Sequence, residues 1–308
     1  MGIQVRMSYY VALEEFILTK QAEGLSHATI TWYRYSTLRF TKFLGQDLPL
    51  DDALDRSREY VVELRATKLS SSSVAGYVRA LLVFMNWSYG QGYLTKDPSK
   101  ILKRVRERQR VPDPLTDLEI KLLMNNLPNP KTFIGCRNRV ALMLMLDSGL
   151  RVGELSGIRV KDVHMNDREI RVLGKGDKER VIPLGDTTLA ELRRYVTWRT
   201  SAKAAANEDH LLLTITRTAT TRNTYTQFIK RFGDEIGLPR LHPHLLRHTA
   251  AMTMLKNGAD AFSVQAILGH STPAMTNRYV HATKTQLGKR HREWSPIDKF
   301  LSDQRKKR

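Results

Sequence analysis

Cysteine and long apolar runs are scarce in this sequence. The chain of 308 residues contains one cysteine, Cys136, which excludes both an internal disulfide and a cysteine-rich zinc site. Its neighbours, GCRNRVALMLML, indicate a small buried hydrophobic residue. No apolar run approaches the roughly 18 residues that a membrane-spanning helix needs, and the N-terminus has no basic-then-apolar signal pattern. We therefore expect a cytoplasmic protein with no membrane partner.

Negative charge is scarce as well. Fifty Lys and Arg stand against thirty-one Asp and Glu, so the formal net charge is +19 at pH 7. An excess of this size favours a polyanionic partner, and nucleic acid is the usual one. A basic surface that serves solubility and attraction to anionic lipid are the alternatives. Hydrophobic residues make up 41% of the chain, which indicates a globular and not a disordered protein.

The length predicts two domains, and the first third of the chain is predicted to be helical. Between residues 25 and 45, apolar side chains recur at intervals of three and four, the spacing of one helix face: Ile30, Tyr33, Thr37, Phe40 and Phe43 or Leu44. A second such stretch follows a serine run and ends at Gly90 and Gly92. Basic side chains between the apolar positions are candidates for a DNA-facing side, with a solvated face as the alternative for each: Arg34, Arg39, Lys42, Lys68 and Arg79.

A basic stretch bounded by prolines separates the two domains. Lys103–Arg110 carries five basic side chains and one acidic one, which predicts an exposed linker. Such a linker can follow a phosphate backbone, so Lys103, Arg104 and Arg106 are further candidate DNA contacts. Thr116 and Glu119 then form a capping-box pattern, which predicts a new helix and a second domain.

The second domain is predicted to be mostly helical with one β element. The stretch EIRVLGKGDKERVIPL contains two β-branched runs, 170–173 and 180–184, around turn-forming glycines and an aspartate. This pattern predicts a hairpin. The fold class is therefore mainly α with a small β-sheet or hairpin (α+β).

Two stretches of this domain could contact a ligand, and the first of them suits a phosphate. In LMLMLDSGLRVGELSGI, an apolar helix is predicted to stop at Ser148 and Gly149, and Arg151 begins the next helix, where free backbone N–H groups gather. The alternative is that Arg151 pairs with Glu154 or Asp147. Lys175 lies between two glycines at the hairpin tip, where a lysine can reach into a groove, although most turn lysines are simply solvated. GxxxxGK[ST] is absent, so this is not a Walker P-loop.

A third stretch, LHPHLLRHTAAMTML, carries histidines beside an arginine. His244 and Arg247 lie three residues apart and would share a helix face. His242, His244 and His248 also permit a zinc site, but HExxH lacks its glutamate here and no cysteine is near. Histidine beside arginine suits proton transfer near a bound anion.

A fourth stretch, LGHSTPAMTNRYVHA, brings His270 and Tyr279 into consideration. Ser271-Thr272-Pro273 is typical of a helix start. The motif residues of the four stretches comprise two arginines, one lysine, two histidines and a tyrosine, and none is acidic, so they offer no ligands for a two-metal phosphoryl-transfer site. They suit attack of a tyrosine on a phosphodiester whose charge is neutralised by guanidinium groups. Packing is the alternative role for Tyr279.

The ordered set GLRVGEL, LGKGDKERVIPL, HPHLLRH, LGH and RY resembles the tyrosine recombinase (phage integrase) family, most closely its Xer-type and transposon-encoded members. The similarity covers nearly the whole chain. It implies a two-domain clamp: a helical, SAM-like core-binding domain at 1–102, the basic linker at 103–114, a catalytic domain at 115–287 and a tail at 288–308. Thr37 departs from the larger apolar residue that is usual in this helix.

The resemblance also implies the roles of six residues. Arg151 and Arg247 would hold the scissile phosphate, Lys175 would protonate the departing 5′ oxygen, His244 would be the base or proton relay, His270 would hydrogen-bond a phosphate oxygen and Tyr279 would attack. The product would be a 3′-phosphotyrosyl link, and no metal, cofactor or ATP would be needed.

The partner implied by the resemblance is a double-stranded recombination site. Four protomers would exchange strands in pairs through a Holliday junction, with or without a second recombinase or accessory protein. WSPIDKFL, residues 294–301, is a candidate for docking on a neighbouring subunit or for packing on its own domain. Type IB topoisomerase-like relaxation, a non-catalytic DNA-binding accessory protein and a metal-dependent nuclease are the alternative functions.

Overall fold

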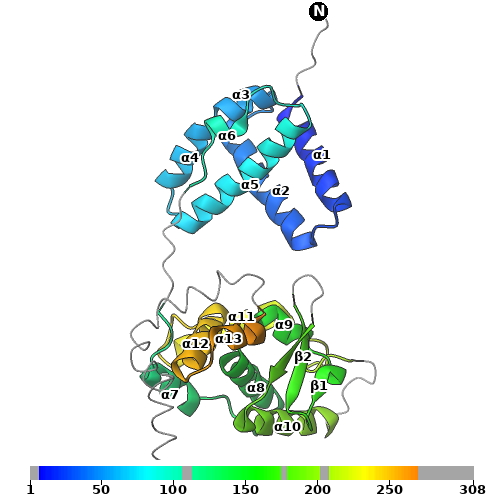
Figure 1. The fold of residues 1–308 in the computed structure, drawn as a ribbon, viewed down its shortest axis with the longest axis vertical. Coiled ribbons are helices and arrows are strands. Elements are labelled where there is room, and N and C mark those ends of the chain that lie inside the picture. Colours follow the sequence, from blue (N-terminus) through cyan, green and yellow to red (C-terminus); the bar gives the residue numbers. More distant parts are fainter. Residues whose placement is uncertain (1–6, 106–112, 175–178, 202–207, 270–308) are drawn as a thin grey trace, which may run out of the picture. The chain divides into compact units, whose positions relative to one another are not determined.

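The computed structural model describes residues 7–105, 113–174, 179–201 and 208–269, which form two compact units, Met1–Val111 and Pro112–Arg308 (Figure 1). Each unit has its own hydrophobic core. No helix in these ranges is both long enough and apolar enough to cross a bilayer. The fold is mainly helical with one small sheet, as the sequence predicts.

The regular secondary-structure elements in the described part of the first unit are all helices. Its elements are α1 (Tyr9–Ala22), α2 (His27–Leu44), α3 (Leu50–Asp55), α4 (Ser57–Ala66), α5 (Ser71–Gly90) and α6 (Pro98–Ile101). The helix ends follow local chemistry: the Ser26 hydroxyl accepts from the backbone N of Thr29 at the start of α2, and Gly45 ends that helix in the left-handed conformation. The serine run before α5 supplies its cap through Ser70.

Aromatic rings fill the core of the first unit. Tyr9, Phe16 and Phe84 meet edge to face, with ring centroids 5.0 and 5.4 Å apart for the pairs Tyr9–Phe84 and Phe16–Phe84. The predicted apolar face of α2 is buried at Phe40 and at the unusual Thr37, whose hydroxyl donates to the carbonyl of Tyr33 at 2.7 Å. A satisfied hydroxyl therefore occupies a core position without an unpaired polar atom.

The second unit combines helices with one three-stranded sheet. Its described elements are α7 (Asp117–Asn125), α8 (Phe133–Ser148), α9 (Val152–Gly157), the 3₁₀ turn η1 (Val160–Asp162), β1 (Val163–His164), β2 (Glu169–Leu173), β3 (Glu179–Pro183), α10 (Asp186–Ser201), α11 (Arg222–Glu235), α12 (Pro243–Lys256) and α13 (Ala261–Leu268). The strands run antiparallel in the order β1-β2-β3, with Ile170 paired to Ile182. The predicted hairpin is confirmed, and the short strand β1 is an addition to it.

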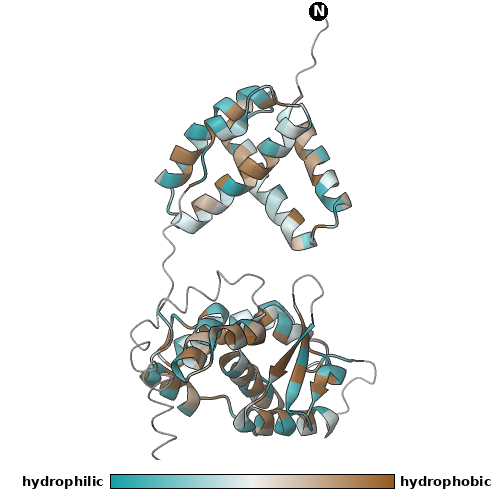
Figure 2. Ribbon diagram, viewed as in Figure 1, coloured by the Kyte–Doolittle hydropathy of each residue, from teal (hydrophilic) through white to brown (hydrophobic). Residues whose placement is uncertain are grey.

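The long helix α8 forms the centre of the second unit. It packs against α10 and α12, and its hydrophobic residues lie in the interior (Figure 2). Cys136 is fully buried in this helix, as its neighbours indicate, and burial raises the pKa of its thiol. The capping box at the start of α7 is also present, with Thr116 and Glu119 bonding reciprocally.

The end of α8 positions the site. The helix stops at Ser148 and Gly149 adopts the left-handed conformation with φ 66°, as the sequence predicts, and Arg151 immediately precedes α9. A Cβ atom at Gly149 would lie 2.4 Å from Cδ2 of Leu268, the last residue of α13. Glycine is needed here for its backbone conformation and because the end of α13 packs directly onto it.

Candidate active site

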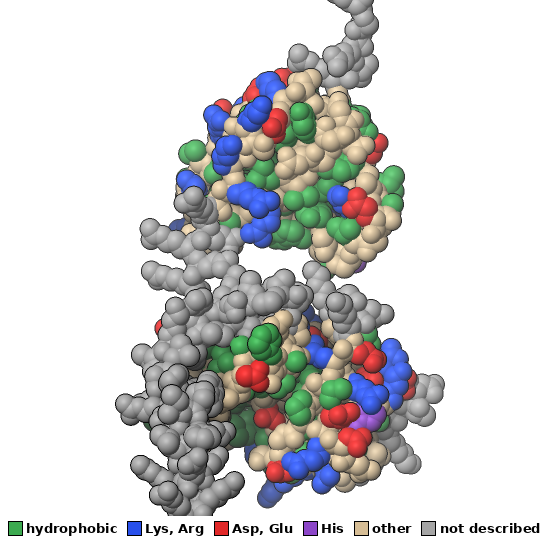
Figure 3. Space-filling view, in the orientation of Figure 1, with side chains coloured by type: hydrophobic (Ala, Val, Ile, Leu, Met, Phe, Trp, Pro, Cys, Tyr) green, Lys and Arg blue, Asp and Glu red, His purple; other side chains and the backbone are tan. Residues whose placement is uncertain are grey.

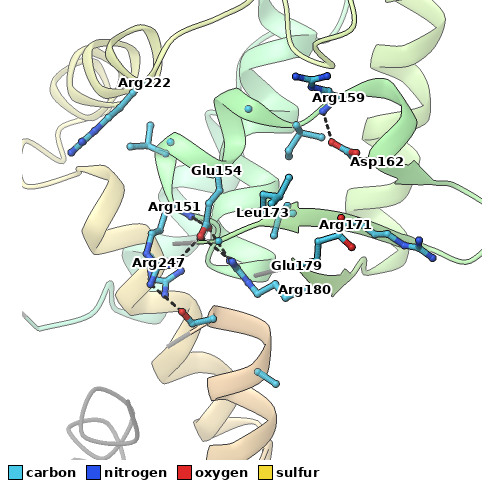
Figure 4. Close-up of a pocket in the computed structure, with 18 of the residues that line it drawn as sticks. Arg151, Glu154, Arg159, Asp162, Arg171, Leu173, Glu179, Arg180, Arg222 and Arg247 are labelled. Atoms are coloured by element: carbon cyan, nitrogen blue, oxygen red, sulfur yellow. Dashed lines mark hydrogen bonds and ion pairs between the residues drawn. The ribbon is translucent and has the colours of Figure 1, made fainter. Parts of the chain in front are cut away.

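A basic pocket of about 1630 Å³ lies in the second unit between α9, the sheet, the start of α11, α12 and α13 (Figure 4). Among the described residues that line it, seven are Lys or Arg and three are Asp or Glu. The basic residues are Arg151, Arg159, Lys161, Arg171, Arg180, Arg222 and Arg247, and the acidic ones are Glu154, Asp162 and Glu179. This excess of positive charge favours an anionic ligand.

Arg151 and Arg247 come from different helices and converge on this pocket. Arg247 lies on α12 and is buried, and its guanidinium donates to the carbonyls of Gly149 at 2.6 Å and Leu268 at 2.7 Å. Arg151 is one-third exposed and donates to the carbonyl of Gly269 at 3.3 Å. The two arginines that the sequence singles out are thus brought together at the end of α13.

In the described chain, three guanidinium groups donate hydrogen bonds to the carbonyls at the end of α13. Arg180, on β3, donates from Nε to the carbonyl of Ile267 at 2.8 Å, so Ile267, Leu268 and Gly269 each accept from a different arginine. The last carbonyls of a helix have no partner within the helix and form the negative end of its dipole. The arginines therefore bind an array of oxygen acceptors that already carries partial negative charge.

Glu154 connects two of these arginines. Its carboxylate accepts from Arg180 at 2.8 and 2.9 Å and from Nη1 of Arg151 at 2.7 Å, and it also accepts from the backbone N of Arg151 at 2.8 Å (Figure 4). Burial alone would raise the pKa of Glu154, but the hydrogen bonds and charges of Arg180 and Arg151 outweigh it and lower that pKa. The sequence offers Glu154 and Asp147 as partners for Arg151. Arg151 forms its ion pair with Glu154, whereas Asp147 accepts a hydrogen bond from the backbone N of Gly185.

His244 lines the same pocket one turn before Arg247. Although its side chain reaches solvent, partial desolvation lowers the pKa of His244, and the positive charges of His242, Arg222, Arg247 and Arg151 lower it further. A neutral imidazole can accept a proton, as a base must. His242 lies outside this pocket lining, with Nδ1 donating to the carbonyl of Arg240 at 2.7 Å. No group of three His, Cys, Asp or Glu in the described residues could hold a metal ion.

Three of the six predicted site residues lie outside the described residues: Lys175, His270 and Tyr279. So do Arg106 and the segment 294–301. The described chain reaches the pocket on both sides of Lys175, since Leu173, Gly174 and Glu179 line it. It also ends at the pocket with Gly269, the residue before His270.

Arg180 and Arg222 are pocket residues that the sequence reasoning did not identify. Arg180 has a detectable signal: it lies two residues before the buried Ile182 and therefore on the inward face of β3, where an arginine is unusual. Arg222 has no comparable local signal, because only the packing of α11 brings its first residue to the pocket.

The candidate DNA contacts of the first unit have varied surroundings. Arg34 forms a two-point ion pair with Glu14 at 2.5 and 2.9 Å, and the guanidinium of Arg39 lies 5.1 Å from the ring centroid of Tyr77. The remaining described candidates have exposed side chains: Lys42, Lys68, Arg79, Lys103 and Arg104. Lys and Arg side chains gather along one side of this unit in Figure 3.

A helical unit followed by a unit with a three-stranded sheet is the architecture of the two-domain tyrosine recombinases. Two solved structures share it. The crystal structure of XerA recombinase matches with a TM-score of 0.52 and 26% identity, covering 92% of this chain and 98% of XerA. The XerH site-specific recombinase matches with a TM-score of 0.70 and 21% identity, covering 92% and 84%.

Sequence comparison gives the family. Residues 114–286 match the phage integrase family. Tyrosine recombinase XerD of Staphylococcus saprophyticus is 32% identical over 290 residues, which cover 92% of this chain and 98% of that protein. The chain therefore belongs to the phage integrase family, and it is a tyrosine site-specific recombinase.

Proposed function

We propose that this recombinase cleaves and rejoins double-stranded DNA through a 3′-phosphotyrosyl intermediate at Tyr279, without metal, cofactor or ATP. Arg151 and Arg247 hold the scissile phosphate, and His244 and His270 complete its surroundings. The observation that carries the proposal is the convergence of Arg151, Arg247 and His244 on one basic pocket. Guanidinium groups that bind helix carbonyls in the free chain have the donor geometry that phosphate oxygens require.

The reaction conserves one phosphodiester bond. The Tyr279 hydroxyl attacks phosphorus and passes its proton to His244, while the bond from phosphorus to the 5′ oxygen breaks. Lys175 gives a proton to that departing oxygen, leaving a free 5′ hydroxyl. The arginines neutralise the charge that develops on the non-bridging oxygens, where the stabilisation of the transition state is largest. Attack of another 5′ hydroxyl reverses the steps and releases the tyrosine, so no external energy source is needed.

DNA is the substrate that the charge and the family support. The solved XerH complex contains its difH substrate in a post-cleavage state. In this chain, α11 begins at Arg222 in the pocket lining and exposes Asn223, Gln227 and Lys230. Amide side chains read adenine edges in the major groove and lysine reaches phosphate or guanine, so α11 is suited to lie along the DNA beside the scissile phosphate.

We propose that the domains 1–102 and 115–287, joined by the linker 103–114, close around the duplex. Four protomers exchange strands in pairs through a Holliday junction, and the tail 288–308 docks on a neighbouring subunit. With DNA as its substrate, the enzyme acts in the cytoplasm on the nucleoid.

A nicked suicide substrate tests the proposal. Cleavage of such a duplex releases a short strand, so the covalent protein–DNA adduct accumulates and is seen on a denaturing gel. We expect the adduct to form in the presence of EDTA, whereas loss of cleavage on chelation would indicate a metal-dependent nuclease. Tyr279→Phe should bind DNA and form no adduct, and an adduct with this variant would mean that another residue attacks.

A further inference from the structure

Arg240 lies in the loop between α11 and α12. Its side chain contacts residues that lie 121 to 127 positions earlier in the sequence. Its guanidinium donates to the Glu119 carboxylate on α7 at 2.6 and 2.9 Å. It also donates to the carbonyls of Asp113 at 2.9 Å and Pro114 at 3.2 Å, which lie just before α7. One side chain thus connects the loop that precedes the His244 helix with the first described residues of the second unit.

Residues 115–117 of the same segment contact α12 directly at two points. The backbone N of Leu115 donates to the buried hydroxyl of Thr249 at 2.9 Å, and Lys256 pairs with Asp117 at 2.8 and 3.0 Å. Thr249 lies in the middle of α12 and Lys256 at its end. Arg240 is the attachment at the N-terminal side of the helix, where His244 is located.

The backbone of Arg240 also contacts His242, two residues before His244. Its carbonyl accepts from Nδ1 of His242, because a carbonyl oxygen can only accept. His242 is the N-cap of α12, Pro243 is its first residue and His244 is its second. Leu241, between Arg240 and His242, is buried. Few residues separate the guanidinium anchor from the imidazole of His244, so a shift of this loop moves the first turn of α12.

Stability is only part of what this arrangement provides. The Arg240 side chain is 40% exposed and that of Glu119 is 23% exposed, so solvent screens part of the attraction between them. The first turn of a helix is held by few internal hydrogen bonds, so its position depends on such outside attachments. Active-site geometry, in contrast, is sensitive to displacements of about 1 Å.

We propose that Arg240 is a positioning residue: together with Glu119 and the carbonyls of residues 113 and 114 it holds the first turn of α12, and so places His244 against the scissile phosphate without contributing to DNA affinity. This inference rests on the role proposed for His244. It adds that residues 113–117, at the start of the described second unit, are attached to the helix that carries His244 and Arg247 and to the loop before it.

The test compares Arg240→Gln with Arg240→Lys and Glu119→Gln in the full chain. At saturating suicide substrate, we expect Arg240→Gln to slow adduct formation about tenfold to a hundredfold while the dissociation constant for the intact site stays within about twofold. Arg240→Lys keeps the charge but reaches fewer acceptors, and Glu119→Gln keeps the carbonyl contacts, so both should show intermediate rates. The melting temperature should stay close to that of the wild type, because solvent screens this partly exposed pair.

Two matched controls separate this role from general loosening. Lys256→Gln removes an ion pair from the last residue of α12 to α7, far from His244, and Asp113→Ala removes a side chain while keeping the carbonyl that Arg240 uses. Both should cleave at the wild-type rate. An equal loss with Lys256→Gln, or a loss of DNA affinity in Arg240→Gln that accounts for its slower cleavage, would overturn the proposal.

A second readout does not depend on recombination. The pKa of the His244 ring, measured by proton NMR against pH in free wild-type and Arg240→Gln protein, reports its surroundings. In the described chain, the titratable and charged groups that act on it are His242, Arg222, Arg151 and Arg247. We expect the pKa of His244 in the variant to move towards its ordinary value of about 6.5. An unchanged pKa with unchanged cleavage would exclude the positioning role. If the wild type forms no adduct, the proposed function fails, and the NMR comparison still decides whether Arg240 positions His244.

Discussion

Arg180 and Glu154 form a two-point ion pair between β3 and α9, with nitrogen–oxygen distances of 2.8 and 2.9 Å. Both side chains are nearly buried, at 10% and 8% exposure. Glu154 also holds Arg151, and Arg180 also holds the end of α13, so this pair connects the sheet and two helices around one pocket.

Arg180→Met should be strongly destabilising, because among the described residues it leaves the Glu154 carboxylate with Arg151 as its one charged partner. Removing one partner of a buried pair costs about 3–5 kcal/mol. The free energy of unfolding by urea measures this. Arg171→Met on the neighbouring strand removes an exposed arginine and should cost less than about 1 kcal/mol. If the two substitutions lower the free energy of unfolding equally, the buried pair contributes no more to stability than an exposed arginine.

Arg151→Ala and Arg247→Ala should each slow adduct formation by about 10²–10³, since each removes a donor that stabilises charge in the transition state. Single-turnover cleavage at saturating DNA measures the loss. Arg194→Ala, on α10 and outside the pocket lining, is the control and should cleave normally. If either pocket variant cleaves at a near-normal rate, that arginine does not hold the phosphate.

Gly149→Ala should destabilise the chain for two separable reasons. Alanine is strained at φ 66°, and its Cβ would lie 2.4 Å from Leu268. Gly45→Ala is a matched control, because Gly45 has φ 75° with no atom within 4 Å of the added Cβ. Each should lose more than about 1 kcal/mol from backbone strain, and Gly149→Ala should lose more than its control. A larger loss at Gly45 would contradict the close packing of α13.

The pH dependence of cleavage should reflect the lowered pKa of His244. A base with a lowered pKa stays neutral as pH falls through 6.5, so the rate should persist there and decline only at lower pH. His242→Gln removes a positive neighbour, and the decline should then begin at higher pH. The measurement is the single-turnover rate from pH 5 to 8, and a wild-type decline centred above 6.5 would argue against His244 as the base.

DNA affinity should fall steeply with salt. With a net charge of +19, the chain is expected to neutralise many phosphates, and the released counterions make the logarithm of the binding constant fall linearly with the logarithm of salt concentration. Fluorescence anisotropy between 50 and 200 mM NaCl, a range over which such proteins lose about 10³–10⁵ in affinity, measures the slope. A flat response would mean that the basic surface does not bind the backbone.

Several parts of the site could be predicted because they depend on neighbours in the chain. The stop at Gly149, the capping box at Thr116 and the helical spacing of His244 and Arg247 each need only a few adjacent residues. The roles of the residues came from the resemblance to a family and not from these local rules. The described structure brings Arg151, His244 and Arg247 to one pocket, as a shared site requires.

The sequence by itself determined the helical character, the hairpin, the positive charge and the order of the motifs, because helix caps, turn chemistry, side-chain periodicity and net charge are local or additive properties. Only the tertiary structure decided that Arg180 pairs with Glu154 and that three arginines donate to the carbonyls at the end of α13. It also decided that Arg240 bonds to residues 113, 114 and 119. Those contacts join residues 21 to 127 positions apart, and their partners are selected by packing around α8 and the sheet. A one-dimensional pattern contains no such distances.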